Sequence, residues 1–81
     1  MELKILTPEK IIFEGEVESI NLPTPGGVIT VLPKHTSLVT PLSAGTVKIQ
    51  NKQGAQNFLS EGGVFEVSQN KAVLLLRNYK S

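Results

Sequence analysis

The stretch that decides the fold runs from residue 62 to residue 78 and reads GGVFEVSQNKAVLLLRN. Phe65 and Val67 alternate with other residues in the period-two pattern of a half-buried strand. Gln69-Asn70-Lys71 breaks the pattern with residues typical of turns, and an apolar run at 72–76 follows. This order predicts a β-hairpin, with strands over Gly63–Ser68 and Ala72–Asn78. Because positions 72–76 are all apolar, we expect the second strand to be covered on both faces.

Short strands of the same kind fill the rest of the chain. Of its 81 residues 20 are β-branched and only 3 are alanine, while Gly and Pro recur, so a long helix has little room. Further strands are expected over 3–7, 10–22, 28–32, 38–42, 46–50 and 56–60, the last two flanking the hairpin turn Asn51-Lys52-Gln53-Gly54. About eight short strands at this spacing predict a β-sandwich or a barrel.

Four positions carry special expectations. The run from 10 to 22 changes phase, which a one-residue bulge between Gly15 and Ser19 would repair. Thr24-Pro25-Gly26-Gly27 fits a type II turn with glycine at its third position. Pro41 marks an edge strand or a bulge, and Gly62-Gly63 marks a bulge or a close backbone approach.

The alternating apolar positions define the expected core. Its members are Leu3, Ile5, Phe13, Val17, Ile20, Val31, Leu38, Val47, Ile49, Phe58, Phe65, Val67, Val73 and Leu75.

The composition argues against most catalytic chemistry. The chain has no Cys, Trp or Asp and one His, which excludes a thiol nucleophile, a cysteine-ligated metal, an aspartic dyad and a two-histidine zinc site within it. We therefore expect no catalytic residue, no metal site and no cofactor. The net charge of +1 gives no electrostatic reason to expect nucleic acid, and no apolar run reaches the length of a membrane span.

A row of glutamates and a single histidine are the polar candidates for a cation-binding or catalytic site. Glu14, Glu16 and Glu18 alternate, but we interpret them as a solvated strand face that discourages edge pairing rather than as a cation site. His35 follows Pro33-Lys34 in a loop and has no nucleophile or orienting carboxylate near it in sequence.

Three stretches resemble a known family. They are Leu3–Gly15 (LKILTPEKIIFEG), Leu32–Leu42 (LPKHTSLVTPL) and Gly62–Val67 (GGVFEV). Together, and in this order over nearly the whole chain, they resemble the N-terminal β-sandwich domain of the epsilon subunit of F-type ATP synthase. The resemblance implies an all-β, flattened antiparallel sandwich of two sheets with about 8–10 short strands.

The resemblance also implies a role. Such a subunit is a non-catalytic part of the central stalk, or rotor, of a proton- or sodium-translocating ATP synthase, and it couples rotation to ATP synthesis by linking the gamma subunit to the c ring. We expect it to be peripheral to the membrane, on the cytoplasmic or stromal face, without inserting into it, and to be monomeric when isolated. By the same resemblance the c-ring contact maps to Gly26, Gly27, Val28, Ile29, Thr30 and His35. The gamma contact maps to Thr7, Ile12, Leu38 and Thr40, where we expect exposed apolar side chains.

The chain departs from the family pattern in two ways. The turn at 26–30 lacks the glutamate usual there, so we expect a ring contact with weak salt dependence. The chain also lacks the C-terminal helical hairpin that is common in the family, so neither inhibition nor nucleotide binding is carried over. Residues 1–81 are expected to form a single β-sandwich domain, either of a natural short form or of a longer subunit that has been shortened, and the first is favoured.

Two alternatives remain open at this point. One is an unrelated ligand- or peptide-binding β-sandwich module, in which a pocket would do the binding. The other is a biotinyl or lipoyl carrier domain, which would present Lys52 or Lys71 at a hairpin tip.

Overall fold

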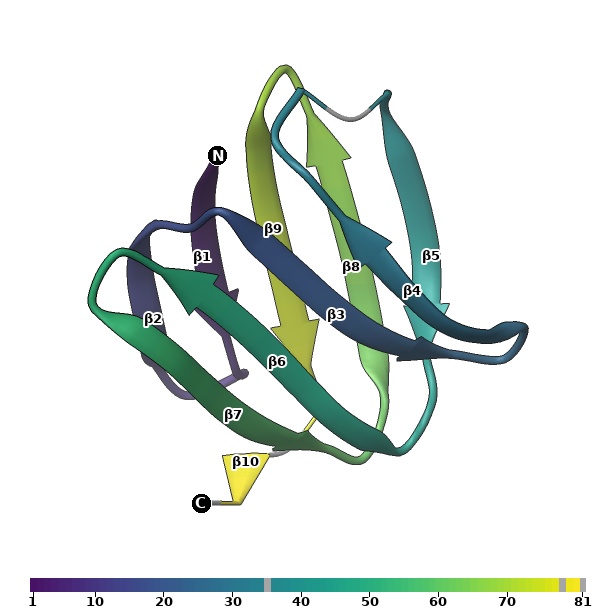
Figure 1. The fold of residues 1–81 in the computed structure, drawn as a ribbon. Coiled ribbons are helices and arrows are strands. Elements are labelled where there is room, and N and C mark those ends of the chain that lie inside the picture. Colours follow the sequence, from purple (N-terminus) through teal and green to yellow (C-terminus); the bar gives the residue numbers. More distant parts are fainter. Residues whose placement is uncertain (35, 78, 81) are drawn as a thin grey trace.

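The computed structural model describes residues 1–34, 36–77 and 79–80, and those residues form strands joined by short turns (Figure 1). The strands are β1 (Glu2–Leu6), β2 (Ile11–Glu16), β3 (Ser19–Thr24), β4 (Gly27–Val31), β5 (Leu38–Leu42), β6 (Gly45–Asn51), β7 (Gly54–Ser60), β8 (Gly63–Ser68), β9 (Lys71–Leu76) and β10 (Tyr79–Lys80). The all-β prediction and the expected strand number are confirmed.

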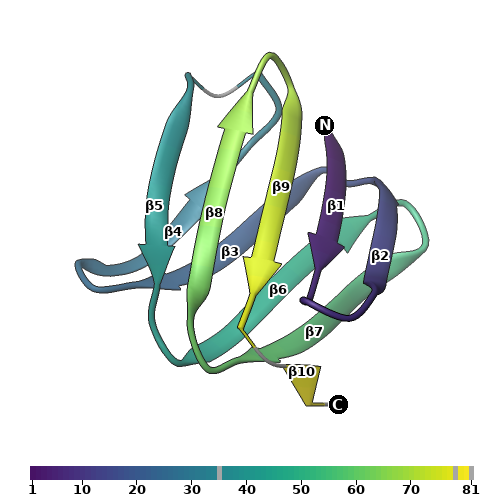
Figure 2. The same ribbon diagram turned by 180° about the vertical axis from the view of Figure 1, so that it is seen from behind.

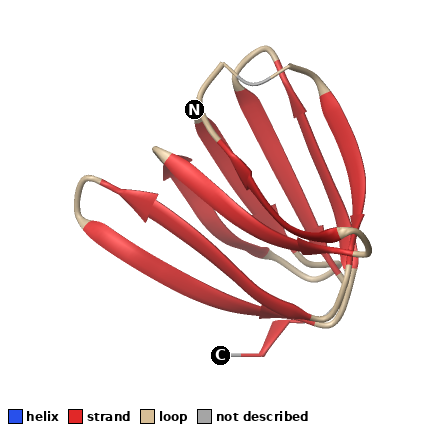
Figure 3. Ribbon diagram, turned by 45° about the vertical axis from the view of Figure 1, so that its right-hand side comes forward, coloured by secondary structure: helices blue, strands red, loops and turns tan. Residues whose placement is uncertain are grey.

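The strands make two five-stranded sheets packed face to face. Sheet A has the order β2-β1-β9-β8-β5 and sheet B the order β10-β7-β6-β3-β4. Sheet B lies in front in Figure 1 and sheet A in front in Figure 2, and Figure 3 shows the two layers from the side. The molecule measures 27 × 27 × 19 Å, so the sandwich is flattened as predicted. One pair, β1 with β9, is parallel, whereas the sequence predicted antiparallel pairing throughout.

The phase change between residues 10 and 22 marks a crossing between the sheets. β2 ends at Glu16 in sheet A and β3 begins at Ser19 in sheet B, so the prediction of one bulged strand was wrong. Val17 N–H donates to the carbonyl of Met1 at 2.8 Å, and Glu18 N–H donates to that of Gln50 at 2.7 Å. These two bonds tie the connection to one sheet and then to the other, which satisfies backbone groups that leave both ladders.

Two of the three predicted turns are confirmed. β6 and β7 pair from Asn51–Gly54 outward, and β8 and β9 are joined through Gln69 and Asn70, whose φ angles of 52° and 64° place both in the left-handed region. The turn between β3 and β4 is not type II. Its left-handed residue is Gly27, with φ of 116°, whereas a type II turn requires positive φ at Gly26.

The core lies between the sheets and holds most of the predicted side chains. Its members are Met1, Leu3, Ile5, Val17, Ile20, Leu22, Val31, Leu42, Val47, Ile49, Phe58, Phe65, Val67, Ala72, Leu74 and Leu76. Phe13 and Leu38 are only half-buried and pack against it. The rings of Phe13 and Phe58 meet edge to face with centroids 6.3 Å apart.

The phase predicted for β9 was wrong. Ala72, Leu74 and Leu76 point into the core, whereas Val73 is half-buried and Leu75 is 48% exposed on the outer face. The strand is therefore not covered on both faces. An unbroken apolar run has no alternation that shows which residues face the core. The strand register determines this instead: Leu74 pairs with the buried Phe65 and therefore faces the core as well.

Pro41 lies on β5, an edge strand of sheet A, as predicted. The close approach expected at Gly62-Gly63 is confirmed at Gly63, where a Cβ atom would lie 1.9 Å from the carbonyl oxygen of Leu75.

Candidate interaction surfaces

The five described residues of the predicted ring contact form one exposed edge. Gly26 is in the β3–β4 turn, and Gly27 to Thr30 lie on β4, the last strand of sheet B. Val28 is 75% exposed, and Thr30 is exposed with its hydroxyl donating to Asn21 Oδ1 at 2.8 Å. Ile29 instead turns inward and packs against the core. His35, the sixth member of the set, lies outside the described residues.

The predicted gamma contact is divided between the two edges of sheet A. Thr7 and Ile12 are at the β1–β2 edge, whereas Leu38 and Thr40 lie on β5, with β1, β9 and β8 between. Ile12 and Leu38 are half-buried and pack against the core, so these side chains are not the exposed apolar groups that were expected.

The Thr7 side chain forms hydrogen bonds within the β1–β2 turn. Its hydroxyl donates to the Lys10 carbonyl at 3.2 Å and accepts the N–H groups of Glu9 and Lys10 at 3.3 and 3.2 Å. The side chain therefore fixes the β1–β2 turn next to Ile11 and Ile12.

An apolar row joins these two halves across the outer face of sheet A. The register places Ile11 opposite Leu6, Leu6 beside Leu75, Leu75 opposite Val64 and Val64 opposite Pro41. The apolar row is thus Ile11, Leu6, Leu75, Val64 and Pro41, one residue from every strand of the sheet. At the usual strand spacing it is about 19 Å long.

The apolar row faces solvent. Ile11, Leu75 and Val64 are 53%, 48% and 42% exposed, Pro41 is exposed and Leu6 is half-buried. Val39, 67% exposed, extends it on β5. A contiguous apolar surface of this kind on a small domain is typical of a protein–protein contact.

Sequence reasoning missed this row for an identifiable reason. Val64 and Leu75 occupy positions that alternate with the buried Phe65 and Leu74, so the correct phase of β8 already placed Val64 outside. The alternation in β8 therefore predicts that Val64 faces outward, but the unbroken apolar run of β9 led to the wrong prediction that Leu75 lies in the core.

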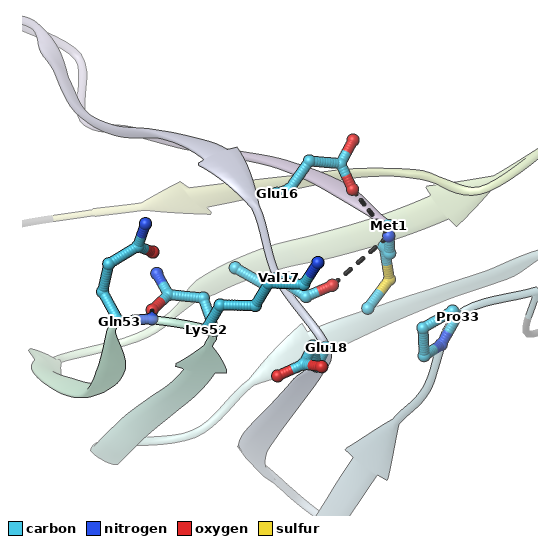
Figure 4. Close-up of a pocket in the computed structure, with 8 residues that line it drawn as sticks. Met1, Glu16, Val17, Glu18, Pro33, Lys52 and Gln53 are labelled. Carbon is cyan, nitrogen blue, oxygen red and sulfur yellow. Dashed lines mark hydrogen bonds and ion pairs between the residues drawn. The ribbon is translucent and has the colours of Figure 1, made fainter.

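A hollow of about 350 Å³ lies where the start of β1, the β2–β3 connection and the β6–β7 turn meet (Figure 4). The Met1 ammonium donates to Glu16 Oε2 at 3.0 Å and to the Val17 carbonyl at 3.3 Å. Lys52 and Glu18 on its border are exposed. The two Met1 contacts hold the chain end against the end of β2 and pair the Met1 ammonium with the Glu16 carboxylate.

The carboxylates of this region are spread rather than gathered. Glu14 lies 3.6 Å from Lys4 Nζ, Glu16 binds the Met1 ammonium, and Glu18 falls beyond the end of β2. Within 1–34, 36–77 and 79–80, no three His, Cys, Asp or Glu side chains are placed to share a metal ion. Glu14 and Glu16 do line an edge strand, where charge opposes pairing with another sheet.

A carrier domain would present Lys52 or Lys71 at the tip of a hairpin. Lys52 does lie in the β6–β7 turn, whereas Lys71 is the first residue of β9 and follows the turn formed by Gln69 and Asn70.

The described residues form a small β-sandwich that exposes an apolar row on one sheet and an uncharged strand edge on the other. Both features are typical of interaction domains. The family is narrower still: residues 1–80 match the model of the ATP synthase delta/epsilon chain β-sandwich domain, and the chain belongs to that family.

Curated relatives are epsilon chains of ATP synthase. The chain is 40% identical over 75 residues to that of Chlorobium limicola, covering 91% of this chain and 85% of the relative. It is 39% identical over 69 residues to that of Endomicrobium trichonymphae, covering 85% of this chain but only 50% of the relative. The chain thus spans half the length of one relative and most of the other.

Solved structures share the fold. A chain in the mitochondrial ATP synthase of Euglena gracilis superposes with a TM-score of 0.89 at 21% identity, covering 96% of this chain and 51% of that one. A chain in the central stalk and c-ring structure from Tetrahymena thermophila gives 0.83 at 24% identity, covering 100% and 66%. Among the described residues, no helix has the length and apolar character needed to cross a membrane.

Proposed function

We propose that the chain is a non-catalytic rotor subunit of a proton- or sodium-translocating ATP synthase, where it links the gamma subunit to the c ring. Membership in the delta/epsilon family supports this role. The single observation that carries it is the apolar row, because a contiguous exposed apolar row across five strands is typical of a surface that a partner covers.

The gamma subunit is the proposed occupant of the outer face of sheet A. The row runs from Ile11, next to Thr7 and Ile12, to Pro41, next to Thr40, and so connects the two separated halves of the gamma contact that the family resemblance implied. On β5 the side chains that this face exposes are Val39 and Pro41, whereas Leu38 and Thr40 alternate with them and are half-buried. Burial of this row is worth about 25 cal/mol per Å² of apolar area before the costs of association.

The c ring is the proposed neighbour of the β3–β4 edge. Gly26, Gly27, Val28 and Thr30 are exposed there, on the sheet that does not carry the apolar row, and Ile29 holds β4 on the core from inside. His35 stays in the proposed contact on the strength of the resemblance alone. Two surfaces on different sheets allow the domain to be held by two neighbours at once and to transmit torque between them.

The domain acts in this proposal as a rigid connector. The three inner strands of each sheet have a paired strand on both sides, so shear between the partners is opposed by many backbone hydrogen bonds. In this proposal the chain itself is peripheral to the membrane, held on the cytoplasmic or stromal face through the ATP synthase complex, and no cofactor takes part.

Reconstitution tests the proposal. The tagged chain is co-expressed with the gamma subunit and c ring of the same synthase, and the purified material is analysed for subunit stoichiometry. We expect gamma and the ring to be recovered with the chain. Recovery of the tagged chain without gamma or the ring would contradict the proposal and would favour a separate ligand-binding module.

A further inference from the structure

Three residues at one end of the sandwich take a backbone conformation that side chains rarely adopt. Within the described part of the chain, the residues other than glycine with positive φ are Lys34 at 64°, Gln69 at 52° and Asn70 at 64°. Lys34 follows Pro33 in a turn beyond β4 of sheet B, whereas Gln69 and Asn70 form the β8–β9 turn of sheet A. Figures 1 and 2 show both stretches at the same end of the sandwich. Such conformations persist where neighbouring contacts enforce them.

The β8–β9 turn has a local cause for its two left-handed residues. Ser68 pairs with Lys71, so the hairpin loop is two residues long, and the turn that matches the twist of the strands requires positive φ at both. Asparagine tolerates this conformation well, whereas for a lysine it is disfavoured about tenfold. Lys34 therefore needs a contact that holds its backbone.

The Asn70 side chain supplies that contact. The Lys34 N–H donates to Asn70 Oδ1 at 3.0 Å, across 36 positions in the sequence. The Asn70 carbonyl accepts the Glu2 N–H at 3.1 Å, which ties the asparagine to the start of β1. Ser37 Oγ donates to Ser68 Oγ at 3.5 Å and adds a contact between the β4–β5 connection and the end of β8. Asn70 thus joins three segments that are distant in the sequence.

The hydrogen bond and the backbone strain at Lys34 are similar in size. A net hydrogen bond favours the conformation that forms it by about two- to tenfold, which is comparable to the preference of lysine against positive φ. Lys34 is exposed, so burial of its side chain does not add to the bond. Loss of the bond is therefore sufficient to move the Lys34 backbone out of the left-handed region.

We propose that Asn70 is a conformational latch, which holds Lys34 in the left-handed conformation and so determines where the Lys34 ammonium stands at this end of the sandwich. When the bond to Asn70 breaks, Lys34 takes the right-handed conformation that L-residues prefer, and its side chain moves. Asn70 is a positioning residue in this inference. The latch goes beyond the proposed function and does not depend on it, because it uses contacts within the chain alone.

NMR of the full chain tests the latch at Lys34 itself. Asn70→Gly removes the acceptor but keeps the freedom for positive φ, so the β8–β9 turn is retained. We expect the Lys34 amide to exchange about fivefold faster in this variant. We also expect the strong cross-peak between its N–H and Hα protons, which positive φ brings close together, to weaken. An unchanged exchange rate or an unchanged cross-peak at Lys34 would overturn the proposal.

Asn51→Ala is the matched control. Asn51 Oδ1 accepts the Gln53 N–H, also at 3.0 Å, but this bond stays within the β6–β7 turn. We expect Asn51→Ala to leave the Lys34 signals unchanged. Equal acceleration of Lys34 exchange in the two variants would show a general loosening of the chain and contradict a latch.

Asn70→Asp separates the bond from a general role of residue 70 in the turn. Aspartate keeps an acceptor oxygen at the same place and tolerates positive φ. We expect the Lys34 cross-peak and exchange rate to stay close to those of the unaltered chain. Lys34 signals like those of Asn70→Gly would contradict the assignment of the latch to the side-chain acceptor.

Replacement of the lysine tests the strain. Lys34→Gly removes the cost of positive φ, so we expect it to raise the urea midpoint of unfolding. Gln53→Gly is the control, because Gln53 lies in a turn but is not among the residues with positive φ, and it should lower the midpoint. Equal losses for the two variants would show that Lys34 is not strained and would reject the latch. These measurements need no partner, so their failure leaves the proposed rotor role standing, and failure of assembly leaves the latch standing.

Discussion

Gly63 shows how a single residue fixes the sandwich. Its φ is 152°, in a region that side chains rarely adopt, and an added Cβ would lie 1.9 Å from the Leu75 carbonyl oxygen. The atom in the way belongs to the backbone of a neighbouring strand and cannot turn aside. The glycine is therefore needed at the start of β8, where it pairs with Leu76 at the end of β9.

We expect Gly63→Ala to lower the free energy of unfolding by about 3 kcal/mol or more, from backbone strain together with displacement of β9. Urea denaturation followed by circular dichroism gives the value. Gly15→Ala is the control, because its Cβ would meet the Phe13 ring at an ordinary 3.5 Å and its φ is not left-handed. A change there stays within about 1 kcal/mol. Similar losses for the two variants would contradict the close approach.

Single residues also show what could and what could not be predicted from the sequence. Phe65, Val67 and Gly63 were predicted correctly, because alternation or a glycine pair marks each one. Leu75 was not, because its neighbours are equally apolar and only the pairing of β9 with β1 and β8 gives its direction.

At the level of strands, β9 is the element whose two faces differ most from expectation. One face packs Leu74 into the core at 0% exposure, and the other presents Leu75 at 48%. Because these adjacent residues are both leucines, substituting each one tests directly which of them faces the core.

Leu74→Ala should cost about 3 kcal/mol of unfolding free energy, since it leaves a cavity among buried side chains. Leu75→Ala should cost less than about 1 kcal/mol, since half of its side chain already contacts water. Thermal and urea denaturation of both variants provide the comparison. The reverse order would restore the phase that the sequence first suggested.

The β2–β3 region shows the limit of strand prediction from one sequence. Apolar parity correctly located a change between residues 15 and 19, but a bulge and a crossing between sheets produce the same change in parity. The structure distinguishes them through two backbone bonds, from Val17 to Met1 and from Glu18 to Gln50, which link partners 16 and 32 residues apart. The local alternation of apolar residues cannot predict hydrogen bonds between residues so far apart in the sequence.

At the scale of the molecule, the two proposed contacts belong to different sheets, and each has its own chemistry. The gamma contact is apolar and lies on the broad face of sheet A. The ring contact lies on an edge of sheet B without charge. The resemblance assigned residues to both proposed surfaces, and the register of the five strands adds that the two groups assigned to the gamma contact lie at opposite ends of the apolar row.

Salt should therefore have little effect on the ring contact. Affinity of the gamma-bound chain for the c ring is expected to change by less than about threefold between low and high salt, because screening acts on exposed charges and β4 carries none. Titration at several ionic strengths measures it. A steep loss of affinity with salt, abolished by substitutions in the β3–β4 turn, would show an ionic contact there instead.

The affinity of the gamma subunit for the chain tests the central claim most directly, with two leucines of similar exposure exchanged for lysine. Leu75→Lys places a charge in the apolar row, at 48% exposure, whereas Leu59→Lys places one on β7 of sheet B, at 52% exposure. If sheet A holds the gamma subunit, calorimetry will show a loss of about tenfold or more for Leu75→Lys and little change for Leu59→Lys. Unchanged affinity for Leu75→Lys, or a greater loss for Leu59→Lys, would contradict the account.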